Sequence, residues 1–159
     1  MKTMKMLQGT GVALITPFKA DKSVDVQALE QLVHYQIDNG IDYLVVLGPT
    51  LSAEEKELVK QTVKKANAGR LPMVLGVGGN NTQALIEQVQ EVSPEDYVAI
   101  LSVSPYYNKP SQEGIFQHYK ALAQASRVPI MLYNVPSRTG SKIDYHTTLR
   151  LAKEVPNII

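Results

Sequence analysis

Two short segments of the sequence carry side chains that could move a proton or bind an anion. The segment YNVPSRTG at residues 133–140 holds the phenol of Tyr133 and the guanidinium of Arg138. A phenol can relay a proton when a neighbouring group eases the transfer, and a guanidinium meets a carboxylate with two parallel N–H···O bonds. On these residues alone, a tyrosine that anchors a turn and a surface or ion-paired arginine remain alternatives.

The second segment, SPYYNKP at residues 104–110, places Tyr106 and Tyr107 ahead of Asn-Lys-Pro. The residue before a proline favours an extended backbone, so this segment cannot continue a helix. We predict a loop whose tyrosines pack on a neighbouring element or lie in a subunit interface, where tyrosine is enriched.

Other kinds of site are poorly supported. The segment GVGGNNT at residues 76–82 lacks the glycine spacing of a dinucleotide fingerprint, and a glycine turn into an Asn/Thr helix cap explains it better. The histidines His34, His118 and His146 are scattered singly, so we expect no metal site, and we expect His34 and His118 to be surface or capping residues of helices. Without cysteine, the chain has no thiolate chemistry.

Short apolar runs alternate with amphipathic stretches along the whole chain. We predict strands at residues 11–16, 43–47, 73–77, 97–103 and 129–133, and helices at 25–38, 52–68, 82–92, 111–125 and about 144–154. The strands are nearly continuous in apolar residues, which is typical of burial on both faces. Ser52 precedes Glu55 by three positions, the spacing of a helix capping box.

This alternation predicts βαβ units and a parallel sheet in a single α/β domain over residues 1–159. Five units correspond to an incomplete (β/α)8 TIM barrel; the alternative is a five-stranded, doubly wound, flavodoxin-like sheet. A barrel fragment would leave strand edges and an apolar face without cover, so we expect the chain to self-associate.

Together with GVALITPF at residues 11–18, the two segments resemble in order and spacing the dihydrodipicolinate synthases of the pyruvate-dependent lyase/aldolase superfamily. The resemblance implies a lyase of lysine biosynthesis that condenses pyruvate with aspartate semialdehyde through a Schiff base and uses no cofactor. It also implies that Tyr133 is the proton relay, that Tyr107 completes this relay from a neighbouring subunit, and that Arg138 binds a carboxylate of the second substrate.

The sequence departs from the family pattern in three places. Residues 47–52, LGPTLS, stand where the family has a Gly-Thr-Thr-Gly-Glu loop. Pro49 replaces several residues of that loop. Thr50 does not match either loop threonine, because its match lies further along, at the entry of the next helix. The match does not extend through KIDYH at residues 142–146. In the family, the strand that starts like NII at residues 157–159 continues to the imine-forming lysine, so we expect this chain alone to be inactive.

Two function hypotheses follow. The chain is either part of a synthase whose activity belongs to a complete protein or complex, or a non-catalytic, engineered fragment or scaffold. The net charge of +1 and the absence of a basic stripe argue against nucleic acid as a partner. No apolar run has the roughly 20 residues of a membrane span, and no signal peptide is recognisable, so we expect a cytoplasmic protein.

Overall fold

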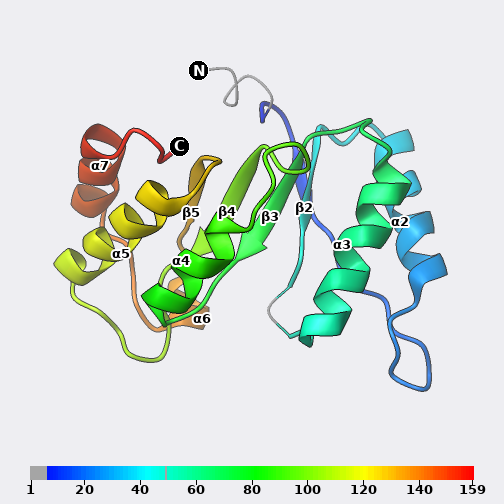
Figure 1. The fold of residues 1–159 in the computed structure, drawn as a ribbon, viewed down its shortest axis with the longest axis horizontal. Coiled ribbons are helices and arrows are strands. Elements are labelled where there is room, and N and C mark those ends of the chain that lie inside the picture. The colour runs from blue at the N-terminus through cyan, green and yellow to red at the C-terminus, as the bar shows by residue number, and fades with distance from the viewer. Residues whose placement is uncertain (1–6, 49) are drawn as a thin grey trace. The chain divides into compact units, whose positions relative to one another are not determined.

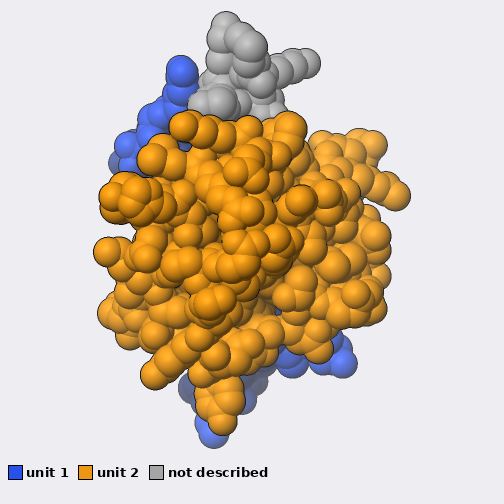
Figure 2. Space-filling view, turned by 90° about the vertical axis from the view of Figure 1, so that its left-hand side faces the viewer, with its two compact units in different colours: residues 1–76 blue, residues 77–159 orange. Residues whose placement is uncertain are grey.

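The computed structural model describes residues 7–48 and 50–159, and the chain divides into two compact units, residues 1–76 and 77–159 (Figure 2). Strands and helices alternate as the sequence predicts. The strands are β1 (Gly11–Ala13), β2 (Tyr43–Val46), β3 (Met73–Val77), β4 (Ala99–Val103) and β5 (Ile130–Tyr133). The helices are α2 (Val26–Asp38), α3 (Ala53–Asn67), α4 (Thr82–Gln90), α5 (Gln112–Ala125), α6 (Pro136–Thr139) and α7 (Tyr145–Glu154).

Strand pairing in the first unit decides between the two folds that the sequence leaves open. β2 lies between β1 and β3 and is parallel to both, with Gly11 opposite Tyr43 and Leu44 opposite Met73. A flavodoxin-like sheet would instead place the first strand between the second and the third. The flavodoxin-like alternative is therefore wrong, and the consecutive strand order is that of a (β/α)8 barrel.

The second unit repeats this arrangement. β4 and β5 are parallel neighbours, and Ile130 of β5 forms a further parallel bridge to Ile158 on its other side. Helix α5 packs against both α4 and α7, and α2 packs against α3 in the first unit (Figure 1). Among the described residues, no helix is long and apolar enough to cross a lipid bilayer.

The local sequence signals for helices are confirmed. Leu29 and Val33, which belong to the apolar stripe of α2, are fully buried. At the start of α3, the Ser52 backbone N–H donates to Glu55 Oε2 at 2.7 Å and the Glu55 N–H donates to Ser52 Oγ at 3.2 Å. This reciprocal pair satisfies two of the backbone donors that a helix start leaves free.

Burial of the strands differs from the prediction in one respect. Leu44 and Val46 of β2 are fully buried, but the alternating residues Tyr43 and Val45 are only half-buried. β4 likewise buries Ser102 and leaves its neighbour Leu101 partly accessible. The prediction of strands buried on both faces is therefore wrong for these two strands, because their helices cover one face only.

Candidate active site

The candidate site lies where β4 and β5 end. Tyr133 is the last residue of β5 and is directly opposite Val103, the last residue of β4. The Ser104 backbone N–H reaches the Tyr133 carbonyl at 3.4 Å, so the loops that follow the two strands start side by side. Tyr133 is 42% exposed. Its phenol can therefore reach a small molecule at this edge, where barrel enzymes build their sites.

The loop after β4 presents Tyr107 to solvent, with 88% of its surface exposed. Tyr107 and Lys109 have φ angles of 72° and 46°, in the left-handed region that costs a residue with a side chain about 1–2 kcal/mol. A hydrogen bond of 2.9 Å from the Asn108 N–H to the Tyr106 carbonyl closes the turn. The predicted loop is confirmed.

Two serines join this loop to the loop after β5. Ser141 Oγ donates to the Pro105 carbonyl at 3.2 Å and lies 3.5 Å from Ser104 Oγ. Gly140, with φ of 66°, packs against the Lys109 side chain so closely that a Cβ there would lie 3.1 Å from Lys109 Cε. The segments that carry Tyr107 and Arg138 are thus held against each other.

Arg138 lies in α6, a single helical turn that the sequence analysis missed. Pro136 occupies its first turn, and the Gly140 N–H ends it with a bond of 2.9 Å to the Pro136 carbonyl. Thr139 is buried, and its hydroxyl contacts the carbonyls of Val135 at 3.2 Å and Ser141 at 2.6 Å. These contacts fix the turn on which the exposed Arg138 stands.

The guanidinium of Arg138 has no ion pair among the described residues. It is therefore available to an external carboxylate, which it can bind with two parallel hydrogen bonds.

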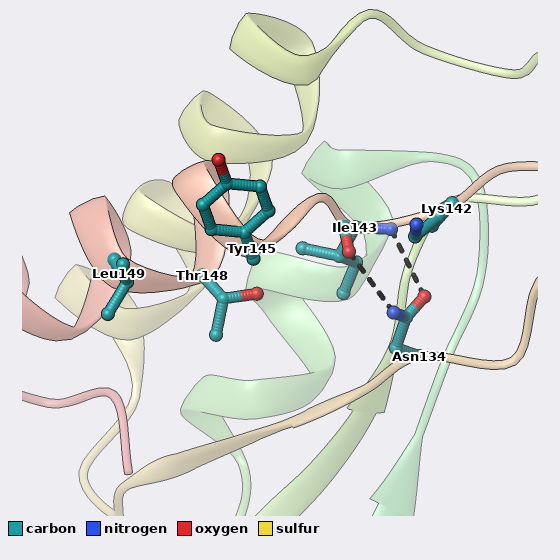
Figure 3. Close-up of a pocket in the computed structure, with 6 residues that line it drawn as sticks. All are labelled: Asn134, Lys142, Ile143, Tyr145, Thr148 and Leu149. Carbon is teal, nitrogen blue, oxygen red and sulfur yellow. Dashed lines mark hydrogen bonds between the residues drawn. The ribbon is translucent and has the colours of Figure 1, made fainter.

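A shallow pocket of about 480 Å³ lies next to these loops, on the side of α7 (Figure 3). The amide of Asn134 makes hydrogen bonds of 3.1 Å to both the carbonyl and the N–H of Ile143, which hold the segment before α7 in place. The remaining lining residues are Lys142, Tyr145, Thr148 and Leu149. Because Tyr107, Tyr133 and Arg138 do not line this pocket, it is separate from the candidate site.

The loop after β2 belongs to the first unit. Pro49 lies outside the described residues, and Thr50 beside it is exposed. Leu47 has a φ of 85°, and its carbonyl approaches Gly76 so closely that a Cβ there would lie at 2.7 Å. Glycine at position 76 is therefore required for the close contact between the end of β2 and β3.

The histidines occupy two different environments. His34 is exposed, as predicted, and its Nδ1 lies 2.7 Å from Arg70 Nη2. His118 was expected to be a surface or capping residue, and this is wrong: it is 3% exposed, its Nδ1 lies 2.8 Å from the side-chain Oγ1 of Thr82, and its Nε2 has no partner among the described residues. Burial lowers the pKa of His118 from 6.5 to about 4.

The three histidines, which lie in helices α2, α5 and α7, belong to no cluster of metal ligands among the described residues. Within residues 7–48 and 50–159, no group of three or more His, Cys, Asp or Glu side chains is placed to hold a metal ion. The candidate site thus consists of phenols, a guanidinium and hydroxyls. Such groups bind carboxylates and move protons.

Parallel strands in chain order, with the candidate residues at the ends of β4 and β5 and in the loops that follow, define an α/β protein of the barrel class. The model of the dihydrodipicolinate synthetase family matches residues 6–159, and the chain belongs to this family.

Curated relatives support the assignment. The chain is 56% identical to the 4-hydroxy-tetrahydrodipicolinate synthase of Flavobacterium psychrophilum over 98% of its length and 55% of the relative's. It is 58% identical to the enzyme of the same name from Parabacteroides distasonis, over 96% of its length and 53% of the relative's. The chain thus spans about half the length of the curated relatives that it matches.

Solved structures show the same fold. One is the chloride-inhibited dihydrodipicolinate synthase of Acinetobacter baumannii complexed with pyruvate, with a TM-score of 0.91 and 42% identity over 96% of this chain and 54% of that one. Another is the dihydrodipicolinate synthase of Aquifex aeolicus, with a TM-score of 0.88 and 42% identity over 96% of this chain and 54% of that one. The prediction of an incomplete (β/α)8 barrel is confirmed.

Proposed function

We propose that this chain supplies the amino-terminal part of a lyase that condenses pyruvate with aspartate semialdehyde in lysine biosynthesis. The observation that carries the proposal is the joined pair of loops after β4 and β5. Tyr107, the exposed Tyr133 and Arg138, which has no ion pair among the described residues, lie at one edge of the β4–β5 pair. The match of the family model to residues 6–159 supports the same reaction.

Each residue has a distinct role in the proposed reaction. Tyr133 relays a proton during formation of the imine between pyruvate and a lysine, and Tyr107 of a neighbouring copy extends the relay. Arg138 binds the carboxylate of aspartate semialdehyde through its planar fork, which a lysine could not reproduce. An imine itself serves as the electron sink, so the proposed reaction requires no cofactor.

Trapping the imine tests this proposal. We expect the 159-residue chain, treated with pyruvate and borohydride, to gain no adduct on a specific lysine and to turn over no aspartate semialdehyde. Mixed or fused with the carboxyl-terminal part of the Flavobacterium psychrophilum relative, it should form the adduct and turn over. In that complex Tyr133→Phe should slow turnover by about 10²–10⁴-fold, the usual contribution of a proton-transfer group.

The matched control is Tyr145→Phe, which changes an exposed phenol on α7 outside the candidate site. Its turnover should equal that of the unsubstituted complex. Turnover by the 159-residue chain alone, or a Tyr133→Phe complex as fast as the control, would contradict the proposed roles.

A non-catalytic scaffold is the second candidate, and the shortened loop at residues 47–52 favours it. Thr50 matches a position further along, so neither threonine of the family loop is present and the loop offers fewer groups for the pyruvate carboxylate. If the mixed complex assembles without turnover, replacing residues 48–50 by the loop of the relative distinguishes the two candidates. Recovered turnover would assign the defect to the loop, and continued inactivity would favour the scaffold.

Carboxylate binding at Arg138 can be measured on the chain itself. We expect succinate to bind with millimolar affinity at best, because one bidentate contact contributes about 1.5–3 kcal/mol. Arg138→Ala should abolish the chemical-shift changes of the loops after β4 and β5, and Arg138→Lys should weaken them. Lys153→Ala, a cation removed from the last turn of α7, is the control. Chemical-shift changes in Arg138→Ala equal to those of the unsubstituted chain would contradict a carboxylate site at Arg138.

Self-association of the chain stays a prediction. On α7, Tyr145 is 68% exposed and Leu149 is 52% exposed, and both residues line the shallow pocket. Contiguous apolar surface of this kind favours contact with another protein surface. We expect light scattering to show oligomers that Leu149→Lys reduces. A stable monomer at high concentration would contradict the prediction.

A further inference from the structure

The sequence contains one asparagine that a glycine follows, Asn39-Gly40, and it ends helix α2. This dipeptide can modify itself. The backbone nitrogen of Gly40 attacks the side-chain carbonyl carbon of Asn39, a cyclic imide forms, and the amide nitrogen leaves as ammonia. Water then opens the ring to aspartate or isoaspartate. The attacking nitrogen is unhindered, because glycine has no side chain.

The end of α2 holds both reacting groups in hydrogen bonds. The Gly40 N–H, which carries the attacking nitrogen, donates to the Ile37 carbonyl at 3.1 Å. The Asn39 side-chain amide, which carries the leaving nitrogen, donates to the Tyr35 carbonyl at 2.8 Å. Both groups therefore face the last turn of the helix and not each other. Ring closure requires both bonds to break.

Burial does not protect the dipeptide from water or base. Asn39 and Gly40 are both exposed, and apart from Gly40 and its two chain neighbours no described atom lies within 4 Å of the position that a Cβ on Gly40 would occupy. Protection thus comes from the hydrogen bonds of the helix end alone. We propose that Asn39-Gly40 is a spontaneous deamidation site that the folded end of α2 keeps closed, so that its modification follows the opening of this helix end.

Deamidation would also weaken the closed helix end. The product replaces the amide donor to Tyr35 by a carboxylate, which repels that carbonyl. It places a negative charge at the negative end of the helix dipole, beside Asp38, and α2 has no basic residue in its last turn. The modified chain should therefore unfold more easily in this region than the unmodified chain.

Mass spectrometry tests the proposal on the full chain. The protein is incubated at mildly alkaline pH, folded or in guanidinium, and the conversion of each asparagine is followed by peptide mapping. We expect position 39 to convert first in guanidinium and at least about tenfold more slowly in the folded protein, the factor given by a modest free energy of local opening. Equal rates in both conditions, or earlier conversion at another asparagine, would overturn the proposal.

Two variants test the effect of the product. Asn39→Asp carries the product charge, and Asn39→Ser lacks both the amide donor and the charge. We expect the denaturation midpoint of Asn39→Asp to lie below that of Asn39→Ser at low salt, and the gap to narrow as salt screens the charge. Equal midpoints at low salt would overturn the destabilising effect of the product charge.

Discussion

Phe116→Ala should lower the free energy of unfolding by about 3–5 kcal/mol, the usual cost of removing a fully buried phenylalanine. Phe116 is 1% exposed in α5, and the guanidinium carbon of Arg150 in α7 lies 3.6 Å from its ring centroid. Arg150 is itself held by Glu113 of α5 at 2.5 Å. The substitution removes the buried ring and the cation–π contact between the two helices. Urea denaturation followed by circular dichroism measures the loss.

Two further variants separate these contributions. Arg150→Ala leaves the ring in place and removes the cation, so its cost should be about 1 kcal/mol. Phe116→Leu keeps most of the buried volume and should cost much less than alanine. A Phe116→Ala loss no larger than that of Arg150→Ala would mean that the ring contributes little packing energy between α5 and α7.

Local signals in the sequence predicted helices and strands well, because their causes lie within a few residues. The capping box at Ser52 needs only the spacing to Glu55. The turn α6 was missed although its signals were present, since Pro136 in the first turn and Gly140 just past the end are typical helix boundaries. The turn formers at residues 134–137 also predict a loop, and a single helical turn is too short to show a helical period.

Two findings depended on contacts between distant residues. The barrel and the flavodoxin-like sheet share the same βα alternation, so only the position of β2 between β1 and β3 distinguishes them. The clamp from Ser141 to the Pro105 carbonyl joins residues 36 positions apart and has no sequence pattern of its own. Tyr133 and Arg138 could be proposed as site residues without this clamp, but the contact that holds their loop against the loop of Tyr107 could not be predicted.

The burial of His118 could have been predicted. Ile115, Tyr119 and Leu122 form the buried stripe of α5, and His118 lies three residues after Ile115 and four before Leu122, on the same face. A histidine is polar, which favoured a surface position. The fold accepts the side chain because it is neutral and because Thr82 satisfies one of its two nitrogens.

Acid should therefore destabilise the chain through His118. The pKa of this imidazole is lowered by burial to about 4 in the folded state, against 6.5 for an exposed histidine. Between these values the unfolded chain binds a proton that the folded chain does not, so stability falls as the pH falls from 6.5 to 4. The difference corresponds to roughly 3 kcal/mol at the lower end. Denaturation midpoints measured across this interval test the prediction.

His118→Asn is the decisive variant, since an amide can contact Thr82 and does not titrate. We expect its stability to be nearly constant between pH 6.5 and about 4.5, whatever its stability at neutral pH. His34→Asn removes an exposed histidine, and this variant should still show the full loss of stability as the pH falls. Carboxylates such as Glu113, whose pKa is lowered by Gln117 and Arg150, lose their contribution only at more acid pH. An unchanged slope in His118→Asn would assign the acid sensitivity of the chain to another group.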